Sequence, residues 1–586
     1  MTTGLTPTEK EELSVIRYQP DEQPPLPMAF GLGFQQAALC ISGMVLTPMI
    51  VIRAAGLGDD AFLLWAVFAA IAISGVTTIL QARRIGRVGA GYPLLMGTSG
   101  AFIAVCVTAL QQGGPALLSS LVFVSAMFQF ALAARLSWVR RVITPTVAGT
   151  VIMLISVTVM PIMFDLLGDV PEDVSPAGPP LSAAVTLLVV AGLALRASGA
   201  LRLWAPVIGL IAGSAVAGFF GLYDLTRVLE ADWVGVPSGW PGLDVNLDAR
   251  FWSLLPAFVF VTLIGAIETV GDAMGVQTVA WRRSRAIDFR EVQGAVAADG
   301  VGNLLSGLAG TVPNTTYSSS IAITELTGVA ARSVGVWIGV VFVVMAFMPK
   351  VAALLLAVPG PVAAAYVTVL IAMLFVLGMR MVVRDGADAR KGVIVGLSFW
   401  IGVGFQNQVI FPEHLGGFWG ALLGNGMTTG GLTAMALTAF LNFTSSRARR
   451  IRTDLDSAAV SPIDDFLCAY AEGRRWPEEA AERLRAAGEE ALLSLLQRHA
   501  QEDDAPPPRL LLTARNDGPD AVLEFVVATG GGNLEDRLLL LSERPLQPEP
   551  NELSLRLLRL YASSVQHQQY HGTDIVIVRV NGRAVR

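Results

Sequence analysis

The chain has 586 residues, of which 53% are hydrophobic and only 15% are charged, and this balance is far more apolar than that of a soluble protein of similar size. The net charge of −6, with no basic patch interleaved with aromatic residues, gives no indication of nucleic-acid binding. The three cysteines, Cys40, Cys106 and Cys468, are too scattered for a disulfide framework. We expect a membrane protein without a metal, a cofactor or an enzymatic activity.

Residues 1–25 form a polar N-terminal tail without a cleavable signal peptide. Apolar runs long enough to cross about 30 Å of hydrocarbon then follow one another as far as Phe443. Region 26–443 is therefore expected to be an all-α polytopic membrane domain. The sequence predicts fourteen spans, at roughly 27–50, 61–81, 92–111, 115–134, 145–164, 181–198, 203–222, 252–279, 291–308, 311–328, 333–349, 360–379, 392–410 and 417–442.

The basic residues of the connecting loops fall almost entirely on one side of this arrangement. Twenty Arg and Lys residues lie on that side, against four on the other: Arg53, Arg227, Arg250 and Lys350. Cytoplasmic loops concentrate Lys and Arg, and an even number of spans returns the chain to its starting side. We therefore expect a multi-pass protein of the inner (plasma) membrane with both termini in the cytoplasm.

The third and tenth spans are interrupted by small, hydroxylated or Gly- and Pro-containing residues. The interruptions are Met96-Gly-Thr-Ser-Gly-Ala-Phe102 and Val312-Pro-Asn-Thr-Thr-Tyr-Ser-Ser-Ser320. Extended backbone at membrane depth is tolerated only where it is buried in protein or lines a cavity, and paired interruptions in two halves of a transporter indicate its substrate site. Small residues that only permit close helix packing are the alternative. The equivalent positions, seven spans apart, favour a site.

Four acidic residues fall within predicted spans, where burying a charge costs ~2.5–3.5 kcal/mol: Glu268, Asp272, Asp299 and Glu325. Glu268 and Asp272 are four residues apart and would share one helix face. Because two such carboxylates repel each other, a proton on one of them is favoured, which would suit a proton carrier. A buried structural pair capped by hydroxyl groups is the alternative. Glu325 lies close to a span end, which indicates an interfacial position.

At these residues the sequence resembles the nucleobase–ascorbate transporter family, also called the nucleobase:cation symporter-2 or uracil/xanthine permease family, over about residues 25–442. The resemblance implies two inverted repeats of seven segments, here about 27–222 and 252–442, which form a core and a gate domain. It also implies short strands in the third and tenth segments and a homodimer. The motifs that carry it are Glu268-Thr-Val-Gly-Asp272, Ala298-Asp-Gly-Val-Gly-Asn303, Pro313-Asn-Thr-Thr-Tyr317 and Leu326-Thr-Gly-Val-Ala-Ala-Arg332.

The resemblance also implies roles for single residues. Glu268 matches the glutamate that binds the N–H groups of the nucleobase ring, and Asp272 and Asp299 match two further acidic positions of the family. The substrate is implied to lie between the third and tenth segments. The residues implied to line the pocket there are Ser99, Gly100, Phe102, Tyr317 and Ser318.

Three positions depart from the family pattern, although we place them at the substrate site as well. Ser319 and Ser320 stand where the family has Gln or Glu followed by Asn, and Gln36 stands where many members have histidine. A short hydroxyl thus replaces a long side chain that would contact a base, and each unpaired polar group on a base costs ~1–3 kcal/mol. We expect a purine-type base such as xanthine or urate, with uracil as a further candidate.

Residues 444–461 are expected to form a basic linker, and residues 462–586 a small cytoplasmic α+β domain. The predicted helices are 480–499 and 552–564, and the predicted strands are 509–514, 521–528, 537–541 and 574–580. The layout weakly resembles a degenerate histidine-kinase-like ATPase domain, with Ser494 where the magnesium-binding asparagine would be, and Gly530-Gly-Gly532 is expected to be a tight turn. We interpret the domain as a regulatory module that binds a partner protein without hydrolysing ATP.

These features predict a secondary active transporter that carries a nucleobase together with protons. Glu268 would be the principal substrate ligand, and the proton would be carried by Glu268 or Asp272, with Asp299 as a third coupling residue. Sodium is the alternative coupling ion. Two other functions stay open: an anion transporter of the sulfate-permease kind, and a non-transporting sensor that signals through the C-terminal domain.

Overall fold

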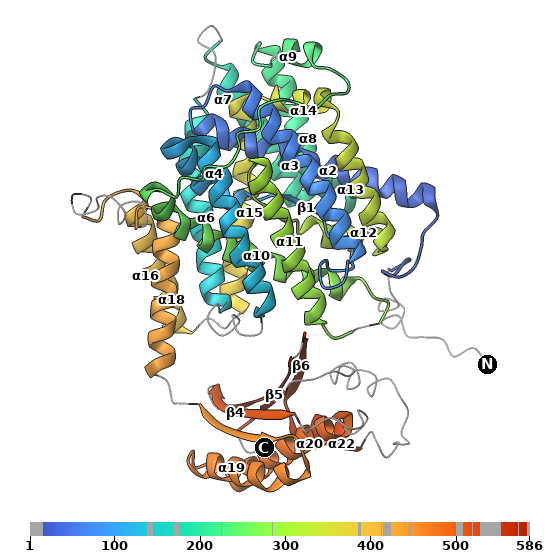
Figure 1. Ribbon diagram of the computed structural model, residues 1–586, viewed down its shortest axis with the longest axis vertical. Helices are drawn as coiled ribbons and strands as arrows, with labels where there is room; N and C mark the ends of the chain where they lie inside the picture. The colour runs from blue at the N-terminus through green and yellow to red at the C-terminus, as the bar shows by residue number, and fades with distance from the viewer. Residues whose placement is uncertain are drawn as a thin grey trace. The chain divides into compact units, whose positions relative to one another are not determined.

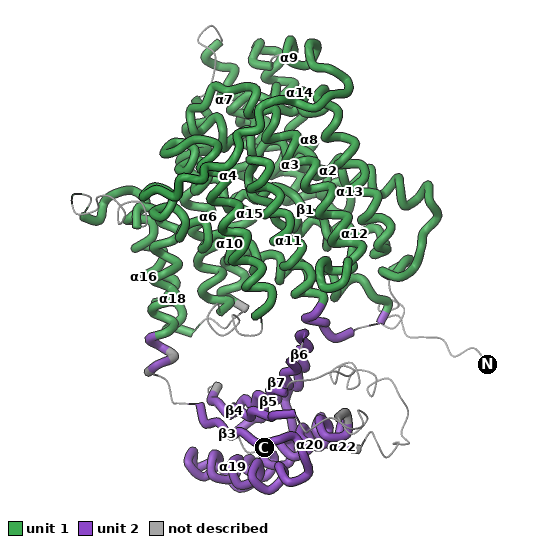
Figure 2. The backbone as a smooth tube through the Cα atoms, viewed as in Figure 1, with its two compact units in different colours: residues 1–282, 291–439 green, residues 283–290, 440–586 purple. Residues whose placement is uncertain are grey.

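The computed structural model describes residues 16–136, 144–168, 175–223, 225–283, 285–384, 388–411, 413, 423–444, 448–499, 508–517, 520–527, 553–571 and 573–582. The chain divides into two compact units, which Figure 2 shows in different colours. Unit 1 comprises residues 1–282 and 291–439, and unit 2 comprises residues 283–290 and 440–586.

Unit 1 is almost entirely helical (Figure 1). In chain order its elements are α2 (Leu26–Ala54), α3 (Asp60–Arg83), β1 (Met96–Thr98), η1 (Gly100–Phe102), α4 (Ile103–Ala134), α6 (Pro145–Leu166), α7 (Gly178–Arg196), α8 (Gly199–Phe219), α9 (Leu225–Glu230), α10 (Ala249–Val279), α11 (Phe289–Ala309), β2 (Asn314–Thr316), α12 (Ser319–Thr327), α13 (Arg332–Ala346), α14 (Pro349–Leu356), α15 (Gly360–Arg384), α16 (Ala389–Gln406) and α18 (Gly426–Thr444).

Eight helical segments of the described chain are long and apolar enough to cross a membrane: α2, α3, η1 with α4, α6, α7, α8, α10 and α15. The pair α13 and α14, bent by 83°, adds a ninth if it is counted as one span. The protein is therefore a polytopic membrane protein. Further predicted spans coincide with α11, α12, α16 and α18, which do not belong to this group, so fourteen spans and an inverted repeat stay predictions.

Helix α4 joins two of the predicted spans. The helix is kinked at Gly114, whose φ of 73° lies in the left-handed region that glycine tolerates. Pro115 follows directly and has no N–H to continue the helical hydrogen bonds. This Gly-Pro pair is where the sequence predicts the turn between the third and fourth spans.

Glycines bring two pairs of helices into direct backbone contact. A Cβ added at Gly75 of α3 would lie 2.6 Å from the carbonyl oxygen of Gly339 in α13. A Cβ added at Gly149 of α6 would lie 2.5 Å from the carbonyl oxygen of Gly378 in α15. Small residues permit such close packing in membranes, where no hydrophobic effect drives helices together. The α3–α13 and α6–α15 pairs therefore depend on glycine at these positions.

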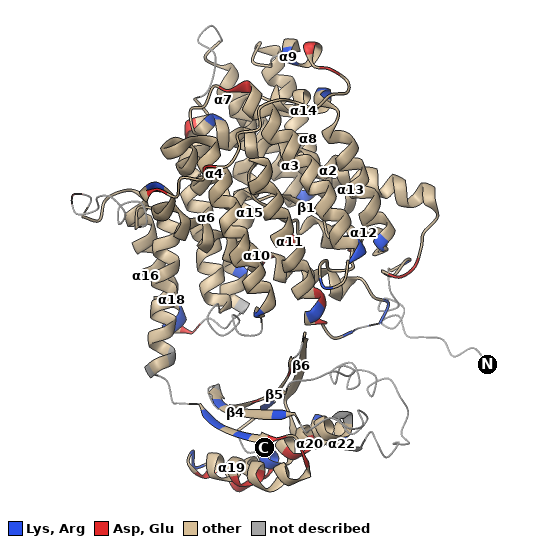
Figure 3. Cartoon of the chain, in the orientation of Figure 1, with Lys and Arg blue, Asp and Glu red and all other residues tan. Residues whose placement is uncertain are grey.

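Charged residues of unit 1 lie mainly near the helix ends, as Figure 3 shows. This distribution is expected for helices that cross hydrocarbon, because a charged side chain in the apolar layer is costly. The acidic residues Glu268, Asp272 and Asp299 are exceptions, since they lie within α10 and α11.

In its described residues, unit 2 combines one antiparallel sheet with three α-helices. Its elements are β3 (Arg449–Asp454), η3 (Ser457–Ala459), α19 (Val460–Glu472), α20 (Glu478–His499), β4 (Arg509–Asp517), β5 (Asp520–Val527), α22 (Leu553–Tyr561), β6 (Ser564–Tyr570) and β7 (Thr573–Val580). The strand order is β3-β4-β5-β7-β6. Apolar residues of β4, β5 and β7 pack against α19, α20 and α22 in one hydrophobic cluster, which makes this unit α+β.

The sequence prediction for this region is corrected at three places, the first of which is helix α19, absent from the prediction. The predicted linker 444–461 contains strand β3, which pairs with β4 at the edge of the sheet. Its Ile451 and Thr453 are half-buried while Arg449, Arg450 and Arg452 are exposed, as suits an edge strand protected by charge. Strand β6 is absent from the prediction because its residues are mostly polar. The predicted strand 537–541 and the turn 530–532 lie outside the described residues.

Candidate substrate site

The two predicted interruptions meet inside unit 1. Strands β1 and β2 pair antiparallel, with Gly97 opposite Thr315 at the centre of the pair. Helical structure begins directly after each strand, with η1 and α4 after β1 and α12 after β2. The backbone N–H and C=O groups of the two extended segments therefore find hydrogen-bond partners in each other, as backbone at membrane depth requires.

Gly97 allows an aromatic ring to lie directly on the strand pair. A Cβ at this position would be 2.4 Å from Cζ of Tyr317, so a larger residue would displace the ring. The Tyr317 hydroxyl donates a hydrogen bond to the carbonyl oxygen of Thr98 at 3.1 Å. The ring and the two strands therefore form one packed unit.

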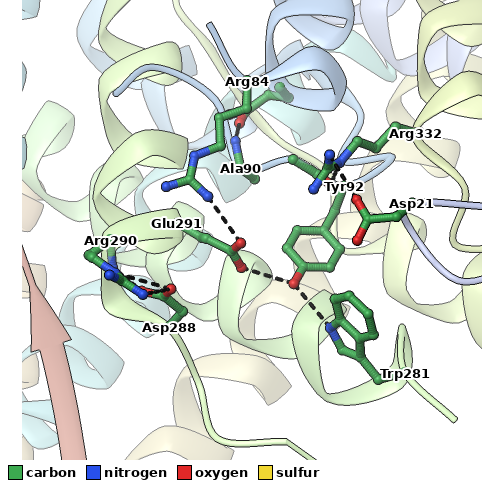
Figure 4. Close-up of polar contacts among 11 residues, drawn as sticks. Asp21, Arg84, Ala90, Tyr92, Trp281, Asp288, Arg290, Glu291 and Arg332 are labelled. Atoms are coloured by element: carbon green, nitrogen blue, oxygen red, sulfur yellow. Dashed lines mark hydrogen bonds and ion pairs between the residues drawn. The ribbon is translucent and has the colours of Figure 1, made fainter. Parts of the chain in front are cut away.

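A polar network positions the loop that leads into β1 (Figure 4). Arg84 forms an ion pair with Glu291 at 3.0 Å, and the Tyr92 hydroxyl donates to the other carboxylate oxygen of Glu291 at 2.9 Å. Trp281 Nε1 donates to the Tyr92 hydroxyl at 3.1 Å. Gln81, buried in α3, accepts a hydrogen bond from the N–H of Ala90 in the loop at 3.0 Å. Its Nε2 donates to the carbonyl oxygen of Ala295 in α11, also at 3.0 Å. These contacts tie the loop to α11 and so set the position of β1.

A cavity of about 320 Å³ lies beside the strand pair. Its lining combines hydroxyl-bearing residues of β1, β2 and α12 with apolar residues of α8 and α15. A planar heterocycle has polar edges and apolar faces, and this mixture suits both. The lining includes Cys40, Thr98, Ser99, Gly100, Leu203, Pro206, Glu268, Thr315, Thr316, Tyr317, Ser318, Ser319, Tyr366, Leu370 and Leu374.

Glu268 is the acidic residue of this lining. It lies on α10, is half-buried, and has no hydrogen-bond or ion-pair partner among the side chains that the structure describes. A carboxylate in such a place is costly unless it is protonated or paired. A ligand that donates N–H groups, or a proton, would meet that requirement.

Asp272 lies one helical turn from Glu268, but its carboxylate contacts Thr316 and Ser318. Its carboxylate accepts hydrogen bonds from Thr316 Oγ1 at 2.7 Å and from Ser318 Oγ at 2.5 Å. Asp272 is 4% exposed and does not belong to the cavity lining. It fastens the turn between β2 and α12 to α10.

Asp299 on α11 is completely buried within a second polar network. Its carboxylate accepts hydrogen bonds from Gln129 Nε2 at 2.6 Å, from Thr269 Oγ1 at 2.8 Å and from Asn303 Nδ2 at 3.4 Å. Asn303 in turn accepts from the backbone N–H of Asn314 in β2 at 2.7 Å. This network connects α4, α10 and α11 to the strand pair.

Three of the predicted substrate-binding residues lie outside the lining of the cavity. The Ser320 hydroxyl accepts a hydrogen bond from the N–H of Leu95 at 2.9 Å, which ties α12 to the segment before β1. Phe102 is 1% exposed and packs near Phe258, and Gln36 is 3% exposed on α2. Their contact with a substrate stays a prediction.

Most residues of the lining are absent from the sequence prediction, and among them are Cys40, Thr98, Thr315 and Tyr366. Thr98 and Thr315 stand inside the interrupted stretches, so the concentration of hydroxyls there was a usable signal. Cys40 and Tyr366 come from ordinary apolar helices, α2 and α15, and no local pattern distinguishes them.

A larger cavity of about 590 Å³ lies elsewhere in unit 1, where the C-terminal end of α2 meets α4, α6 and the start of α10. Its lining includes Arg53, Gln111, Asp165, Leu254 and Phe258. No group of three His, Cys, Asp or Glu residues suited to a metal ion occurs in the described part of the chain.

The model of the xanthine/uracil permeases, described as "Permease family", matches residues 28–409. Xanthine permease XanP of Escherichia coli K12 is 27% identical over 451 residues, which cover 74% of this chain and 96% of that protein. Uric acid permease PucK of Bacillus subtilis 168 is 27% identical over 433 residues, or 72% of this chain and 97% of that protein.

Among solved structures, the transmembrane domain of the cyanobacterial bicarbonate transporter BicA aligns with 72% of this chain and 99% of that domain. The TM-score is 0.44 and the sequence identity is 16%.

Proposed function

Because the chain belongs to the nucleobase–ascorbate transporter family, whose model matches residues 28–409, we propose that it carries a purine-type nucleobase, such as xanthine or urate, across the plasma membrane in symport with protons. The relatives are named as permeases for xanthine and uric acid, and members of this family are transporters rather than enzymes. The base is a substrate in this proposal, and no cofactor is required.

One observation carries the proposal. A single carboxylate of the described lining, that of Glu268, faces a cavity whose other polar groups are hydroxyls, the Cys40 thiol and backbone. The N–H groups of a nucleobase would pair with this carboxylate, and a proton would neutralise it when the site is empty. Asp272 and Asp299 are proposed only as secondary coupling residues, which assist Glu268 without being essential for accumulation, because their hydrogen bonds already give each of them a structural role.

The proposed architecture has fourteen segments in two inverted repeats, about 27–222 and 252–442, with both termini in the cytoplasm and two copies in a homodimer. Support for the repeat comes from the pairing of β1 with β2, since each would occupy the third segment of its half. The excess of basic residues in one set of loops supports the orientation. Residues 462–586 are proposed to be a cytoplasmic regulatory domain that can bind a partner protein.

In this orientation part of the cavity lining lies toward the cytoplasmic side. Leu203 and Pro206 lie in the first turns of α8, close to Arg202, while Leu370 and Leu374 lie on either side of the middle of α15. The larger cavity beside Arg53 would open to the outer side. Movement of the core against the gate would expose the substrate site to the two sides of the membrane in turn.

The test is uptake of labelled xanthine, urate, uracil and adenine into proteoliposomes with and without a proton gradient. We expect one of the oxopurines to accumulate when the gradient is present. Glu268→Gln should abolish accumulation, because it removes both the acceptor charge and the proton site. Glu325→Gln is the matched control: this residue lies on the neighbouring helix α12, is exposed and is absent from the cavity lining, so its uptake should equal that of the native protein.

Accumulation by Glu268→Gln at the native rate would refute the site assignment. Absence of uptake of all four bases by the native protein, inserted and folded, would refute transport of a nucleobase and favour the sensor or the anion transporter.

A further inference from the structure

Two buried hydroxyls in the cavity have no hydrogen-bond partner in the described part of the protein: Ser99 Oγ and Thr315 Oγ1. The residues are 1% and 4% exposed, and both line the cavity. The neighbouring hydroxyls differ, because Thr98 donates to the carbonyl of Gly43 at 3.1 Å and Thr316 donates to Asp272 at 2.7 Å. The absence of a partner is therefore a property of these two positions.

An unpartnered buried hydroxyl lowers stability by about 1–3 kcal/mol relative to a bonded one. Buried polar groups in folded proteins are nearly always satisfied by protein, water or ligand. Two orphan hydroxyls in one cavity, beside a carboxylate that also has no described partner, point to a polar ligand that bonds them.

The strand pair places the two hydroxyls on one face. Thr315 is opposite Gly97, and Ser99 follows two residues after Gly97 and bonds through its N–H to the carbonyl of Pro313 at 2.9 Å. Side chains two residues apart on a strand point the same way, so Ser99 and Thr315 are diagonal neighbours, ~7–8 Å apart with their Cβ atoms somewhat closer. This separation leaves space for one oxygen atom that accepts a hydrogen bond from each hydroxyl.

Helix α10 leaves the same region open. A Cβ added at Gly265 would lie 4.0 Å from Thr315 Oγ1 and 3.7 Å from the ring of Phe102. Gly265 and Glu268 are three residues apart and share a helix face. The Thr315 hydroxyl is therefore on the side of α10 that carries the Glu268 carboxylate.

We propose that Ser99 and Thr315 form a second polar subsite, which donates two hydrogen bonds to one oxo group of the ring whose N–H edge faces Glu268. The inference rests on the proposed function and narrows it. The carboxylate selects for a ring N–H, and the two hydroxyl donors select for a carbonyl oxygen, which has two lone pairs. Together they select a lactam-bearing heterocycle, of which xanthine and urate are examples, over a purine without an oxo group.

The experiment compares the purified full chain with Thr315→Val, Ser99→Ala and the double variant. Valine has the shape of threonine without the hydroxyl. Thr150→Val is the matched control, because Thr150 is fully buried on α6, its hydroxyl bonds its own helix at 2.7 Å, and it lines neither cavity. Uptake of labelled xanthine and thermal unfolding in detergent, with and without xanthine, are the two readouts.

Each single variant should raise the xanthine concentration for half-maximal uptake roughly 3- to 10-fold, the factor that corresponds to one lost hydrogen bond. The double variant should lose less than the product of the two factors, since both donors bind one oxygen. Without xanthine, Thr315→Val should unfold at the native temperature or above it, because an orphan hydroxyl is replaced by a methyl group. Thr150→Val should leave the half-saturation concentration unchanged.

The subsite is refuted if the native protein takes up xanthine and Thr315→Val does so with the same half-saturation concentration. A lower unfolding temperature of ligand-free Thr315→Val would also refute it, because the hydroxyl would then have a partner in the protein. This second readout does not depend on transport. The two hypotheses can therefore fail separately. Absence of native uptake counts against the proposed function, and the unfolding temperature of Thr315→Val shows whether the Thr315 hydroxyl has a hydrogen-bond partner in the ligand-free protein.

Discussion

The carboxylates of Glu268, Asp272 and Asp299 in unit 1 differ in what surrounds them rather than in chemical type. Asp272 and Asp299 each accept two or more hydrogen bonds from neighbouring side chains, whereas Glu268 faces the cavity without a described partner. A carboxylate that is held by donors is stabilised as an anion, and one without donors is free to take a proton or a ligand. At the scale of single residues, the division between structural and functional acids follows from these contacts.

For Asp299 we predict a structural effect larger than a transport effect. Asp299→Ala would leave the donors of Gln129, Thr269 and Asn303 without their acceptor, and breaking a buried charged network costs about 3–5 kcal/mol. The variant should therefore unfold at a clearly lower temperature in detergent. Asp299→Asn keeps the shape and one acceptor, so it should be intermediate in stability and still accumulate substrate. Loss of proton-driven uptake in Asp299→Asn at native stability would instead make Asp299 a proton carrier.

The elements that frame the site are positioned by glycine and by short strands. Gly97 allows the ring of Tyr317 onto the strand pair, and the glycine pairs of α3–α13 and α6–α15 allow backbone contact between helices. None of these contacts could form with a larger residue, since a Cβ would lie within 2.6 Å of its neighbour. At these positions the helices and strands around the cavity therefore accommodate glycine and no larger residue.

The α6–α15 pair offers a test at this scale. Gly149→Ala would place a methyl group 2.5 Å from the carbonyl oxygen of Gly378, so the helices must separate, and overpacking of this kind costs about 1–3 kcal/mol. Gly396→Ala in α16 meets nothing within 4 Å and removes a glycine from a helix, which favours helix by up to about 1 kcal/mol. We expect the first variant to lower the unfolding temperature and the second to keep or raise it. Equal stability of the two variants would contradict the packing argument.

For the whole molecule, the division into two units separates transport from the C-terminal region. Both cavities and every proposed site residue belong to unit 1, and the family match ends at residue 409. Unit 2 has its own hydrophobic cluster and its own sheet. Transport should therefore be possible without unit 2, whose contribution would be regulatory.

We accordingly predict that a chain ending after Phe443 still accumulates the base that the full chain accumulates. The measurement is uptake into proteoliposomes with equal amounts of inserted protein, controlled by size-exclusion chromatography of both forms. A well-folded truncated chain without uptake, beside an active full chain, would show that unit 2 is required. A sensor would show no flux in either form.

Much of this architecture follows from the sequence alone, because hydropathy, charge and interruption are local properties. The apolar runs predict the membrane helices, and the hydroxyl-rich stretches around Ser99 and Thr315 mark the two strands that pair. The α+β character of the C-terminal region follows likewise from alternating apolar residues. The edge strand β3 is not predicted from the sequence, because its arginine-rich composition is also typical of a basic linker.

Only the tertiary structure decides which acidic residue faces the cavity and which residues join it there. Glu268 and Asp272 share a helix and differ by one turn, yet the hydroxyls that bind Asp272 come from β2 and the turn after it, 44 and 46 residues further along the chain. Cys40 and Tyr366 reach the lining from helices with no distinguishing pattern. Such contacts depend on how distant segments pack, which local composition does not encode.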